Sequence, residues 1–329
     1  MASFSSPIRK IAVYTSGGDA PGMNAAIRAV ARTALNAGIQ VDGIIGGYAG
    51  ILGEHFESIS SRSMANLIQK GGTYLKTGRC PEFHKAEVRR DAVQKLKKNG
   101  IDAAICIGGD GSFTGAHALW EEHQFPIVGI PGTIDNDIFG TDSTIGFDTA
   151  INTALEAIDR IRDTASSHDR VFIVEVMGRD SGFIAASVGL AGGAEEIIAP
   201  EYPTTVDKIV EKIKASMARG KKSSILVTAE GQKPGRAYDL SEQIRKKMGL
   251  EAKVCILGHQ QRGGSPTATD RVLATRMGAF AVELLLSGNC DVYTALQGQN
   301  MTAVSLSSAL GQKKLAPKEF IQLASLLAQ

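Results

Sequence analysis

The sequence predicts an α/β fold with parallel sheets, and three observations lead to this prediction. Short apolar runs rich in β-branched residues recur along the chain, as in strands that are covered on both faces. Stretches of helical periodicity separate these runs, and such alternation is typical of doubly wound sheets. The length of 329 residues suits two domains at about 100–200 residues each. We therefore expect two doubly wound domains.

Each predicted strand is a short, mostly β-branched run. The strands are expected over Ile11–Tyr14, Val41–Ile45, Ala103–Ile107, Pro126–Ile130, Val171–Val176, Ile225–Ala229 and Val254–Leu257. Because parallel sheets bind ligands beyond the carboxyl ends of their strands, the residues that follow each run are the candidates for a site.

Helices are expected between the strands. In Val206–Met217 the apolar residues fall at positions 206, 209, 210, 213 and 217, which places them on one stripe of a helix. Asn24–Leu35 and Asp270–Leu286 have a similar pattern.

The composition argues against several function classes. Lys and Arg number 36 and Asp and Glu 34, a net charge of +2, so no charge excess indicates nucleic acid or a membrane surface as partner. The first ten residues lack the apolar segment of a signal peptide, and no stretch approaches the ~20 apolar residues of a membrane span. The four cysteines are scattered, and the six histidines show no metal-ligand spacing. We expect a cytoplasmic protein without a metal cage.

A glycine-rich turn follows the first predicted strand. From Thr15 to Asn24 it reads TSGGDAPGMN. Glycines between a strand and a helix let the backbone approach a phosphate, and the helix start adds free N–H groups. A plain tight turn explains the same glycines, and neither a P-loop nor a clean G-x-G-x-x-G is present.

A second glycine-rich turn, Gly108–Ser112, follows the strand Ala103–Ile107. A carboxylate between glycines, here Asp110, can face Mg²⁺ while the bare backbone holds phosphate oxygens. The same residue can instead cap the next helix.

Two carboxylates follow the strand Pro126–Ile130. Asp135 and Asp137 lie two residues apart, with the hydroxyl of Thr133 nearby. Such a set can take a proton from a sugar hydroxyl. For this segment taken alone, a Pro/Gly/Asx turn is the simpler interpretation.

Arg179 and Glu230 follow the strands Val171–Val176 and Ile225–Ala229. An arginine at a strand end can neutralise the charge on a transferring phosphoryl group, and a surface arginine is the alternative. Glu230 can accept hydrogen bonds from sugar hydroxyls, or it can be a capping or solvated carboxylate.

A basic group ends the series. Lys253, His259 and Arg262 fall around one predicted strand end, beside Gly263 and Gly264, and would fit a phosphomonoester. A lone histidine is more often structural, whereas this grouping is harder to dismiss. Because charged, glycine-rich segments follow one strand after another, one anion-binding active site explains them better than separate turns do.

Taken together, these motifs resemble those of the 6-phosphofructokinase family. The segment from Lys253 to Arg271 is similar to the family signature. The strings GGDAPGMN, GGTYL, RCPEF, IGGDGS, PGTIDND and VEVMGR occur in the family's order. The resemblance runs from about Arg9 to about Leu286 and weakens beyond it.

The resemblance implies the phosphofructokinase fold and a glycolytic reaction. A larger domain for ATP and Mg²⁺ is expected at residues 1–145 plus 258–308. A smaller domain for fructose 6-phosphate is expected at residues 146–257 plus 309–329. The implied reaction moves the γ-phosphoryl group of MgATP to the 1-hydroxyl of fructose 6-phosphate, in line and without a phosphoenzyme.

The resemblance also implies roles for the matching residues. Asp135 would be the general base, held by Thr133 and Asp137. Asp110 would meet Mg²⁺, and Arg179 would stabilise the transferring phosphoryl group. ATP would be held by Gly18, Tyr48, Arg79, Cys80, Gly109, Asp110, Gly111 and Ser112. Fructose 6-phosphate would be held by Thr133, Asp135, Met177, Gly178, Arg179, Glu230, His259 and Arg262.

Oligomerisation follows from the same resemblance. Arg170 and Lys253 would reach the substrate from a neighbouring subunit, and family members of this short type are usually homotetramers. Lys253 stands where many members have arginine, so bidentate phosphate contact is lost. His84 stands where an ATP-side arginine is common.

An effector site for ADP or phosphoenolpyruvate is implied as well. Its matching positions are Arg28, Arg32, Arg162, Glu195, Arg219 and Lys221. Ser61 sits where arginine is usual, Asn66 replaces an aspartate and Lys70 replaces an arginine. Allosteric control that is altered or absent is therefore expected.

The phosphoryl donor is expected to be ATP. Relatives that use pyrophosphate typically carry an acidic residue at the position of Gly111 and a lysine at that of Gly132. Both are glycine here, which argues against a pyrophosphate-dependent phosphofructokinase.

Three other classes are weighed against this interpretation. A NAD or lipid kinase shares the GGDG turn but would not carry PGTIDND and the Lys253–Arg271 signature together. A dinucleotide-binding oxidoreductase would need the absent G-x-G-x-x-G. A non-catalytic regulatory paralogue would be expected to have lost Asp110, Asp135 or Arg179, and all three are present.

Overall fold

The computed structural model describes residues 2–168, 170–221 and 223–328. The chain divides into two compact units, each with its own sheet. Unit 1 comprises Met1–Thr133, Ile138–Asp148 and Arg262–Lys314. Unit 2 comprises Ile134–Asp137, Thr149–Gln261 and Leu315–Gln329. These units divide the chain after residues 148, 261 and 314, and residues 134–137 join unit 2. The borders of the ATP and fructose 6-phosphate domains expected after 145, 257 and 308 stay predictions.

Unit 1 is built on a mixed sheet. Its strands are Lys10–Thr15 (β2), Gln40–Ile44 (β3), Phe56–Ser58 (β4), Ala103–Gly108 (β5), Ile127–Pro131 (β6), Val292–Gln297 (β12) and Asn300–Ser305 (β13). They are ordered β13-β12-β6-β5-β2-β3-β4. The strands from β12 to β3 are parallel, whereas β4 and β13 pair antiparallel at the edges. The short strands Ala2–Ser3 (β1) and Asn289–Cys290 (β11) form a separate antiparallel pair.

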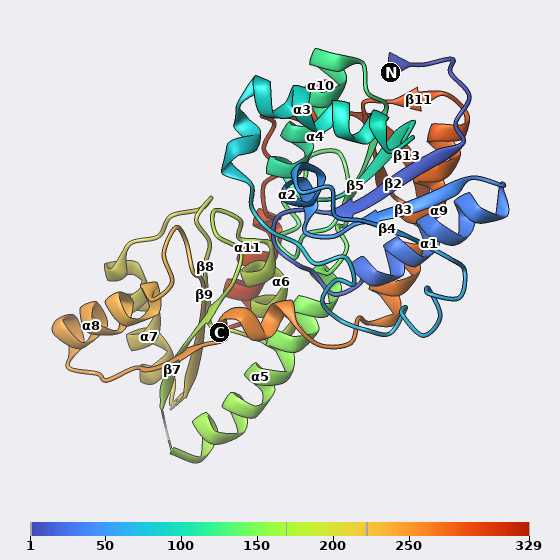
Figure 1. The fold of residues 1–329 in the computed structure, drawn as a ribbon. Helices are drawn as coiled ribbons and strands as arrows, with labels where there is room; N and C mark the ends of the chain where they lie inside the picture. The colour runs from blue at the N-terminus through green and yellow to red at the C-terminus, as the bar shows by residue number, and fades with distance from the viewer. Residues whose placement is uncertain (1, 169, 222, 329) are drawn as a thin grey trace. The chain divides into compact units, whose positions relative to one another are not determined.

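Helices cover both faces of the unit 1 sheet, as a doubly wound fold requires (Figure 1). They are Met23–Asn36 (α1), Gly47–Leu52 (α2), Pro81–His84 (η1), Ala86–Lys98 (α3), Asp110–His123 (α4), Ala268–Leu286 (α9) and Leu306–Ala309 (α10). Helices α1 and α9 pack against each other and the sheet on one face, and α2, α3, α4 and α10 pack on the other.

Buried aromatic rings hold the second of these faces. The ring of Tyr48 on α2 stacks on Phe83 with centroids 4.0 Å apart, and Phe113 on α4 stacks on Tyr293 of β12 at 5.2 Å. All four side chains are at most 5% exposed. Large buried rings contribute much of a core's hydrophobic stabilisation, so this packing joins α2 to η1 and anchors α4 to the sheet.

Unit 2 is built on a smaller, parallel sheet. Its strands are Val171–Val176 (β7), Glu196–Ile198 (β8), Ser224–Ala229 (β9) and Lys253–Ile256 (β10), in the order β10-β7-β9-β8. Its helices are Phe183–Ala191 (α6), Val206–Ala218 (α7), Arg236–Met248 (α8) and Lys318–Leu327 (α11). Helices α7 and α8 pack against each other, α8 contacts β7 and β10, and α6 and α11 pack together with β8. Helix Phe147–His168 (α5) begins at the end of a unit 1 segment, and the 3₁₀ helix Gly258–Arg262 (η2) ends at the start of one.

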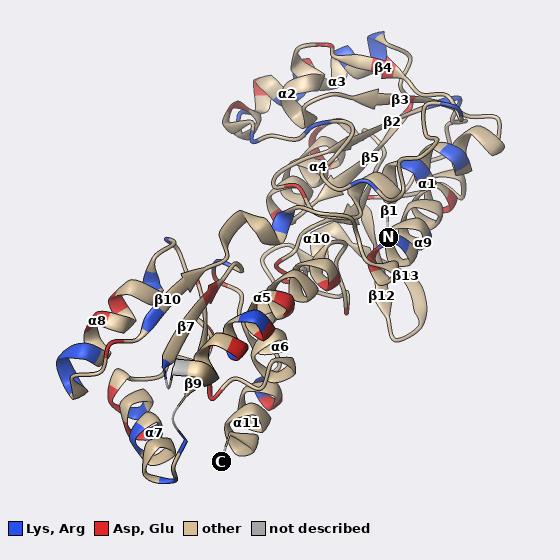
Figure 2. Ribbon diagram, turned by 90° about the horizontal axis from the view of Figure 1, so that it is seen from below, with Lys and Arg blue, Asp and Glu red and all other residues tan. Residues whose placement is uncertain are grey.

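Positive charge gathers at the end of α8 (Figure 2). The last turn carries Arg245, Lys246 and Lys247, where positive charge complements the helix dipole. Arg245 pairs with Glu242 at 2.8 Å and Lys247 with an aspartate of α7 at 2.6 Å. These exposed pairs explain the patch as a solvated helix end.

The fold class predicted from the sequence is confirmed, and every predicted strand is found to within one residue at each end. The expectation of wholly parallel sheets needs one correction, because β4 and β13 are antiparallel. The hairpin β12–β13 was not among the predicted strands.

Candidate active site

Three glycine-rich segments of unit 1 lie side by side. They follow β2, β5 and β6, which are neighbours in the sheet. Beyond the strands, the Ser16 N–H donates to the Ile107 carbonyl at 2.9 Å, and the Gly132 N–H donates to the Gly108 carbonyl at 3.0 Å. Strand β2 pairs with β3 on one side and β5 on the other, which makes this a topological switch point, where α/β sheets bind ligands.

The turn after β5 requires bare backbone. A Cβ on Gly108 would lie 2.6 Å from both the Ser16 carbonyl oxygen and the Ser112 Oγ. Helix α4 begins at Asp110, and Asp110 and Gly111 are exposed while Ser112 is buried. The free N–H groups of a helix start therefore lie beside an exposed carboxylate, an arrangement that suits phosphate and a cation.

Tyr48, predicted to hold ATP, contacts the turn after β5 with its side chain. Its side chain is 5% exposed, and its hydroxyl donates to the Ser112 carbonyl at 2.6 Å. A Cβ on Gly115 would lie 2.9 Å from the Tyr48 ring, so that glycine admits the ring against α4. The Tyr48 side chain thus contacts the protein and positions the first turn of α4.

Arg79 and Cys80 follow a segment that is tied to the first glycine-rich turn. The Gly17 N–H donates to the Gly78 carbonyl at 3.4 Å, and the Thr77 hydroxyl donates to the Gly17 carbonyl at 3.0 Å. Arg79 is exposed and Cys80 is partly buried. The structure therefore brings these two residues, which lie far along the chain, to the turn that contains Gly18.

Asn24 was not predicted as a site residue, yet its side chain joins residues 70–74 to the start of α1. It is 2% exposed, and its amide donates to the Lys70 carbonyl at 3.0 Å and the Gly71 carbonyl at 3.1 Å. Its Oδ1 accepts from the Tyr74 N–H at 2.6 Å. Asn24 ends the GGDAPGMN string, which is the only signal that could have indicated it.

Arg262 lies at the first glycine-rich turn within unit 1. Its guanidinium donates to the Asp19 carbonyl at 3.0 Å. A Cβ on Gly18 would lie 2.8 Å from Nη1 of Arg262, so the bare glycine makes room for the guanidinium. Arg262 was predicted to hold the sugar phosphate, and the structure places it beside a residue predicted to hold ATP.

In unit 2, the turn after β7 has an unusual backbone. Met177 is 6% exposed, Gly178 has φ +135°, and Arg179 has φ +52° with an exposed side chain. The Ser181 N–H closes the turn on the Gly178 carbonyl at 2.8 Å. Glycine is required at 178, because a Cβ there would lie 2.3 Å from the Ser181 carbonyl oxygen.

The segment that contains Asp135 and Asp137 is hydrogen-bonded to the turn after β7. The carbonyl of Asp135 accepts a hydrogen bond from the Ser181 hydroxyl at 2.7 Å. Asp135 and Asp137 are both partly buried and belong to unit 2. Thr133 belongs to unit 1, where its carbonyl accepts from the Thr144 hydroxyl at 2.6 Å.

Glu230 lies next to the turn after β7. It follows β9, the neighbour of β7, and its N–H donates to the Val176 carbonyl at 2.9 Å. Its side chain is 8% exposed. His259 is exposed on η2, beyond the end of β10. Glu230 and Met177 are therefore at one edge of the unit 2 sheet.

The prediction that Lys253, His259 and Arg262 surround one strand end is wrong for Lys253. Lys253 is the first residue of β10 and pairs with Phe172, so it lies at the amino edge of the sheet. Arg170, just before β7, lies at the same edge. Lys253 bonds Glu251 at 2.7 Å, and this bond, with a smaller effect of Arg170, lowers the pKa of Glu251.

Comparison with known proteins decides the family. The family model described as Phosphofructokinase matches residues 10–285. This chain belongs to the phosphofructokinase family. The ATP-dependent 6-phosphofructokinase 1 of Thermus thermophilus is 54% identical over 321 residues, 98% of this chain and 100% of that protein. The ATP-dependent 6-phosphofructokinase of Bacillus mycoides is 50% identical over the same shares of the two chains.

Solved phosphofructokinase structures share the fold. The enzyme from Saccharomyces cerevisiae matches with a TM-score of 0.84 and 38% identity over 92% of this chain, which spans only 45% of the yeast chain. A pyrophosphate-dependent phosphofructokinase from Marinobacter aquaeolei matches with a TM-score of 0.85 and 26% identity, over 97% of this chain and 88% of that one.

The candidate effector residues of this phosphofructokinase fall into two groups. In unit 2, Glu195 is 7% exposed, and it pairs with Lys221 at 2.6 Å and with Arg162 at 4.0 Å. Arg219 donates to the Ser216 hydroxyl nearby in the chain at 3.3 Å.

In unit 1, the other two candidate effector residues, Arg28 and Arg32, lie one turn apart on α1, and Arg32 donates to the Ser61 carbonyl at 3.4 Å. Asn66 has φ +55°, a conformation that asparagine tolerates better than most residues. This backbone conformation explains why asparagine is suited to position 66.

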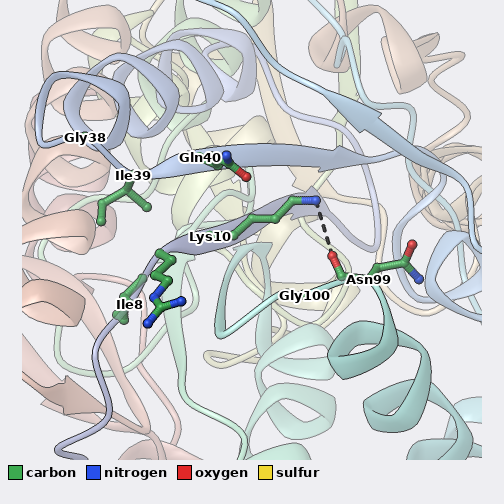
Figure 3. Close-up of a pocket in the computed structure, with 8 residues that line it drawn as sticks. Ile8, Lys10, Gly38, Ile39, Gln40, Asn99 and Gly100 are labelled. Atoms are coloured by element: carbon green, nitrogen blue, oxygen red, sulfur yellow. Dashed lines mark hydrogen bonds between the residues drawn. The ribbon is translucent and has the colours of Figure 1, made fainter.

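A surface pocket lies elsewhere in unit 1 (Figure 3). It is lined by Ile8–Lys10, Gly38–Gln40, Asn99 and Gly100, at the amino ends of β2 and β3. The Lys10 ammonium donates to the Asn99 carbonyl at 3.3 Å. Because the glycine-rich turns lie at the opposite ends of these strands, this pocket is not part of the candidate site.

Residues 2–168, 170–221 and 223–328 contain neither a clustered set of metal ligands nor a helix suited to span a membrane. No group of three or more His, Cys, Asp and Glu side chains there could hold a metal ion. No helix there has both the length and the apolar character that crossing a membrane needs.

Proposed function

We propose that this chain transfers the γ-phosphoryl group of MgATP to the 1-hydroxyl of fructose 6-phosphate, as a glycolytic enzyme of the cytoplasm. The observation that carries the proposal is 54% identity, over 98% of this chain, to a relative named ATP-dependent 6-phosphofructokinase 1. The positions of Asp110, Asp135 and Arg179 at strand ends support it.

The donor would bind at the turns of unit 1. The bare backbone of Gly18 and of Gly109–Ser112, with the start of α4, suits the phosphates, and Arg79 and Cys80 flank them. Tyr48 would act by positioning α4.

Mg²⁺ fits this site through Asp110. Mg²⁺ is often held by one or two carboxylates together with substrate phosphates and water, so one exposed carboxylate beside a phosphate cradle is sufficient. When bound, the ion would neutralise charge on the phosphate oxygens.

The acceptor would react at residues of unit 2. The carboxylate of Asp135 takes the proton of the sugar 1-hydroxyl as that oxygen bonds the γ-phosphorus. The bond from the γ-phosphorus to the bridging oxygen breaks, and ADP leaves with its electron pair. Thr133 and Asp137 would orient the base, and Arg179 would stabilise the charge on the transferring group.

The sugar phosphate would be held by residues that follow the unit 2 strands. Within one chain these are Met177, Gly178, Glu230 and His259, and Arg262 completes the set. The burial of Met177 and Gly178 beside Glu230 supports this proposal.

Arg170 and Lys253 would serve the site of a second copy. They lie at the amino edge of β7 and β10, and a strand of six residues spans about 16–20 Å at about 3.3 Å per residue. That is too far for either side chain to reach a phosphate at the Met177 edge of the same sheet. An assembly of at least two copies that complete one another's sites follows from this proposal, and the resemblance to the family favours a homotetramer.

The choice of ATP over pyrophosphate is proposed to depend on Gly111. A Cβ at Gly111 would meet nothing within 4 Å, so an acidic side chain fits sterically and would oppose the nucleotide by its charge. A Cβ at Gly132 would lie 3.0 Å from Ile107 and Met23, so a lysine there needs neighbours to shift. We expect Gly111→Asp to raise the KM for ATP at least tenfold, and Gly111→Ala, the uncharged control, to leave it within threefold. Equal effects of the two variants would contradict the charge argument.

An effector site for ADP or phosphoenolpyruvate is proposed around Glu195, Arg162, Arg219 and Lys221, with Arg28 and Arg32 as further members. The buried carboxylate with two cations in unit 2 supports it. The departures at Ser61, Asn66 and Lys70 indicate a weakened response.

The proposed reaction is tested by assaying fructose 1,6-bisphosphate from fructose 6-phosphate and Mg²⁺, in parallel with ATP and with pyrophosphate. Product with ATP alone is expected. Product with pyrophosphate would overturn the donor assignment, and product with neither would overturn the proposed function.

A further inference from the structure

We propose that Ser181 is a positioning residue that couples Asp135 to the Arg179 turn, an inference that rests on the proposed function. Ser181 is 3% exposed, and its hydroxyl donates to the Asp135 carbonyl at 2.7 Å. Its N–H donates to the Gly178 carbonyl at 2.8 Å, which closes the turn that presents Arg179. One buried residue therefore bonds both segments that carry the proposed base and the proposed phosphoryl-stabilising arginine.

The Arg179 turn depends on such support. Gly178 has φ +135° and Arg179 has φ +52°, a left-handed conformation that a side-chain-bearing residue rarely adopts. Conformations of this kind persist where the surroundings over-determine them. At the start of the turn the Met177 N–H donates to Oε1 of Gln261 at 2.8 Å, and Gln261 is 0% exposed. The turn is thus held at its first residue by Gln261 and at its last by Ser181.

The start of helix α6 holds the side chain of Ser181 in place. Its hydroxyl oxygen accepts from the Phe183 N–H at 3.4 Å, at the first residue of α6. The hydroxyl therefore accepts from the helix and donates to the Asp135 carbonyl, a chain of bonds in which each strengthens the next. The Ser181 hydroxyl thereby links the start of α6 to the backbone of Asp135.

The link between Asp135 and the Arg179 turn matters because Asp135 is the proposed base. A base that takes a proton as a bond forms must stay within hydrogen-bond reach of that proton, and small misplacements of reacting groups lower kcat strongly. Removing the Ser181 hydroxyl leaves the Asp135 carboxylate, the Arg179 guanidinium and the backbone bond that closes the Arg179 turn in place, but it breaks the bond that ties the Asp135 backbone to that turn. The loss should fall on kcat rather than on binding.

The first test is Ser181→Ala, with Ser187→Ala as the matched control because Ser187 is a partly buried serine of α6. Ser181→Ala should lower kcat about tenfold while the KM for ATP stays within about twofold. Ser181→Cys, which keeps a weaker donor of similar size, should give an intermediate kcat. Ser187→Ala should match the wild type.

The second test asks whether Ser181 acts through Asp135. In a double-mutant cycle, Ser181→Ala should cost about tenfold in the wild type but less than about threefold in an Asp135→Ser background. A purely structural role would give the same factor in both backgrounds, together with a lower unfolding midpoint, and would overturn the proposal. Should Ser181→Ala fail to fold, Ser181→Cys decides by the same cycle.

Failure of this inference is distinguishable from failure of the proposed function. If Asp135→Ser alone keeps its kcat, the base assignment fails, and the inference fails with it. If Asp135→Ser is inactive while Ser181→Ala and Ser181→Cys both equal the wild type, only the positioning role of Ser181 is overturned.

Discussion

The carboxylate of Glu175 caps a helix from a different element, and its removal should destabilise unit 2 selectively. Glu175 lies on β7 and is 1% exposed. Its two oxygens accept from the N–H groups of Gly235 at 2.7 Å and Ala237 at 2.8 Å, at the start of α8. Gly235, the N-cap of α8, has no side chain to do this. The helix start therefore depends on Glu175 for two of its free donors.

The size of the effect follows from these two bonds. A hydrogen bond to a charged acceptor contributes about 1.5–3 kcal/mol, and a buried donor left unsatisfied adds to the loss. Glu175→Ala should therefore lower the free energy of unfolding of unit 2 by about 3–6 kcal/mol. Glu175→Gln keeps one acceptor oxygen and should cost about half as much. Total stabilities of about 5–15 kcal/mol are usual, so the alanine variant leaves unit 2 marginal.

Urea unfolding measured by two probes separates the units. The single tryptophan, Trp120, lies on α4 of unit 1, whereas far-ultraviolet circular dichroism reports on both units. In Glu175→Ala the dichroism should begin to fall at lower urea than the Trp120 fluorescence. Glu211→Gln, which removes an exposed carboxylate of α7 in the same unit, is the control and should change neither curve. An unchanged dichroism midpoint in Glu175→Ala would refute the capping argument.

Two further predictions concern the thiols and the pH dependence. MgATP should slow the reaction of Cys80 with a thiol reagent at pH 8, whereas Cys106, which is 0% exposed and whose pKa burial raises to about 12, should stay unreactive with or without nucleotide. Labelling of Cys80 that is unaffected by MgATP would contradict its place in the donor site. Burial raises the pKa of Asp291 above its usual 3.8, and the hydrogen bond from His117 offsets this only in part. Because the folded state resists ionisation of this carboxyl, the wild type should lose unfolding free energy relative to Asp291→Asn as the pH rises above 3.8 through the folded pKa. Urea unfolding of both proteins from pH 3 to pH 7 measures this. A difference in unfolding free energy that stays constant over this range would count against the prediction.

Most of the predicted parallel strands were predictable because they are almost wholly buried, whereas β10 is only partly buried, and the buried parallel strands β8 and β12 were not predicted. A run such as Ala103–Ile107 must be continuously apolar to lie between two helix layers, and its sequence shows this directly. The outer strand of the hairpin, β13, was missed because it is only partly buried and contains polar residues such as Asn300 and Thr302. Edge strands carry a weaker apolar pattern than central ones.

The candidate site was predictable as a set of strand ends but not as a set of contacts. A sequence indicates that Lys253 adjoins a strand, whereas the register with Phe172 decides that it lies at the amino edge. The bond from Ser181 to the Asp135 carbonyl joins residues 46 apart in sequence through a backbone atom. Because the acceptor is a backbone carbonyl, the contact demands no particular residue type at position 135, so no motif records it.

The most direct test of the account is the steady-state kinetics of Asp135→Ser with MgATP and fructose 6-phosphate. Asp159→Asn is the matched control, because Asp159 is an exposed aspartate of α5 in the same unit. If Asp135 takes the proton of the acceptor hydroxyl, kcat should fall by about 10²–10⁴-fold while both KM values change by less than about threefold, and Asp159→Asn should match the wild type. A kcat for Asp135→Ser within about threefold of the wild type would contradict the assignment of the active site to these turns.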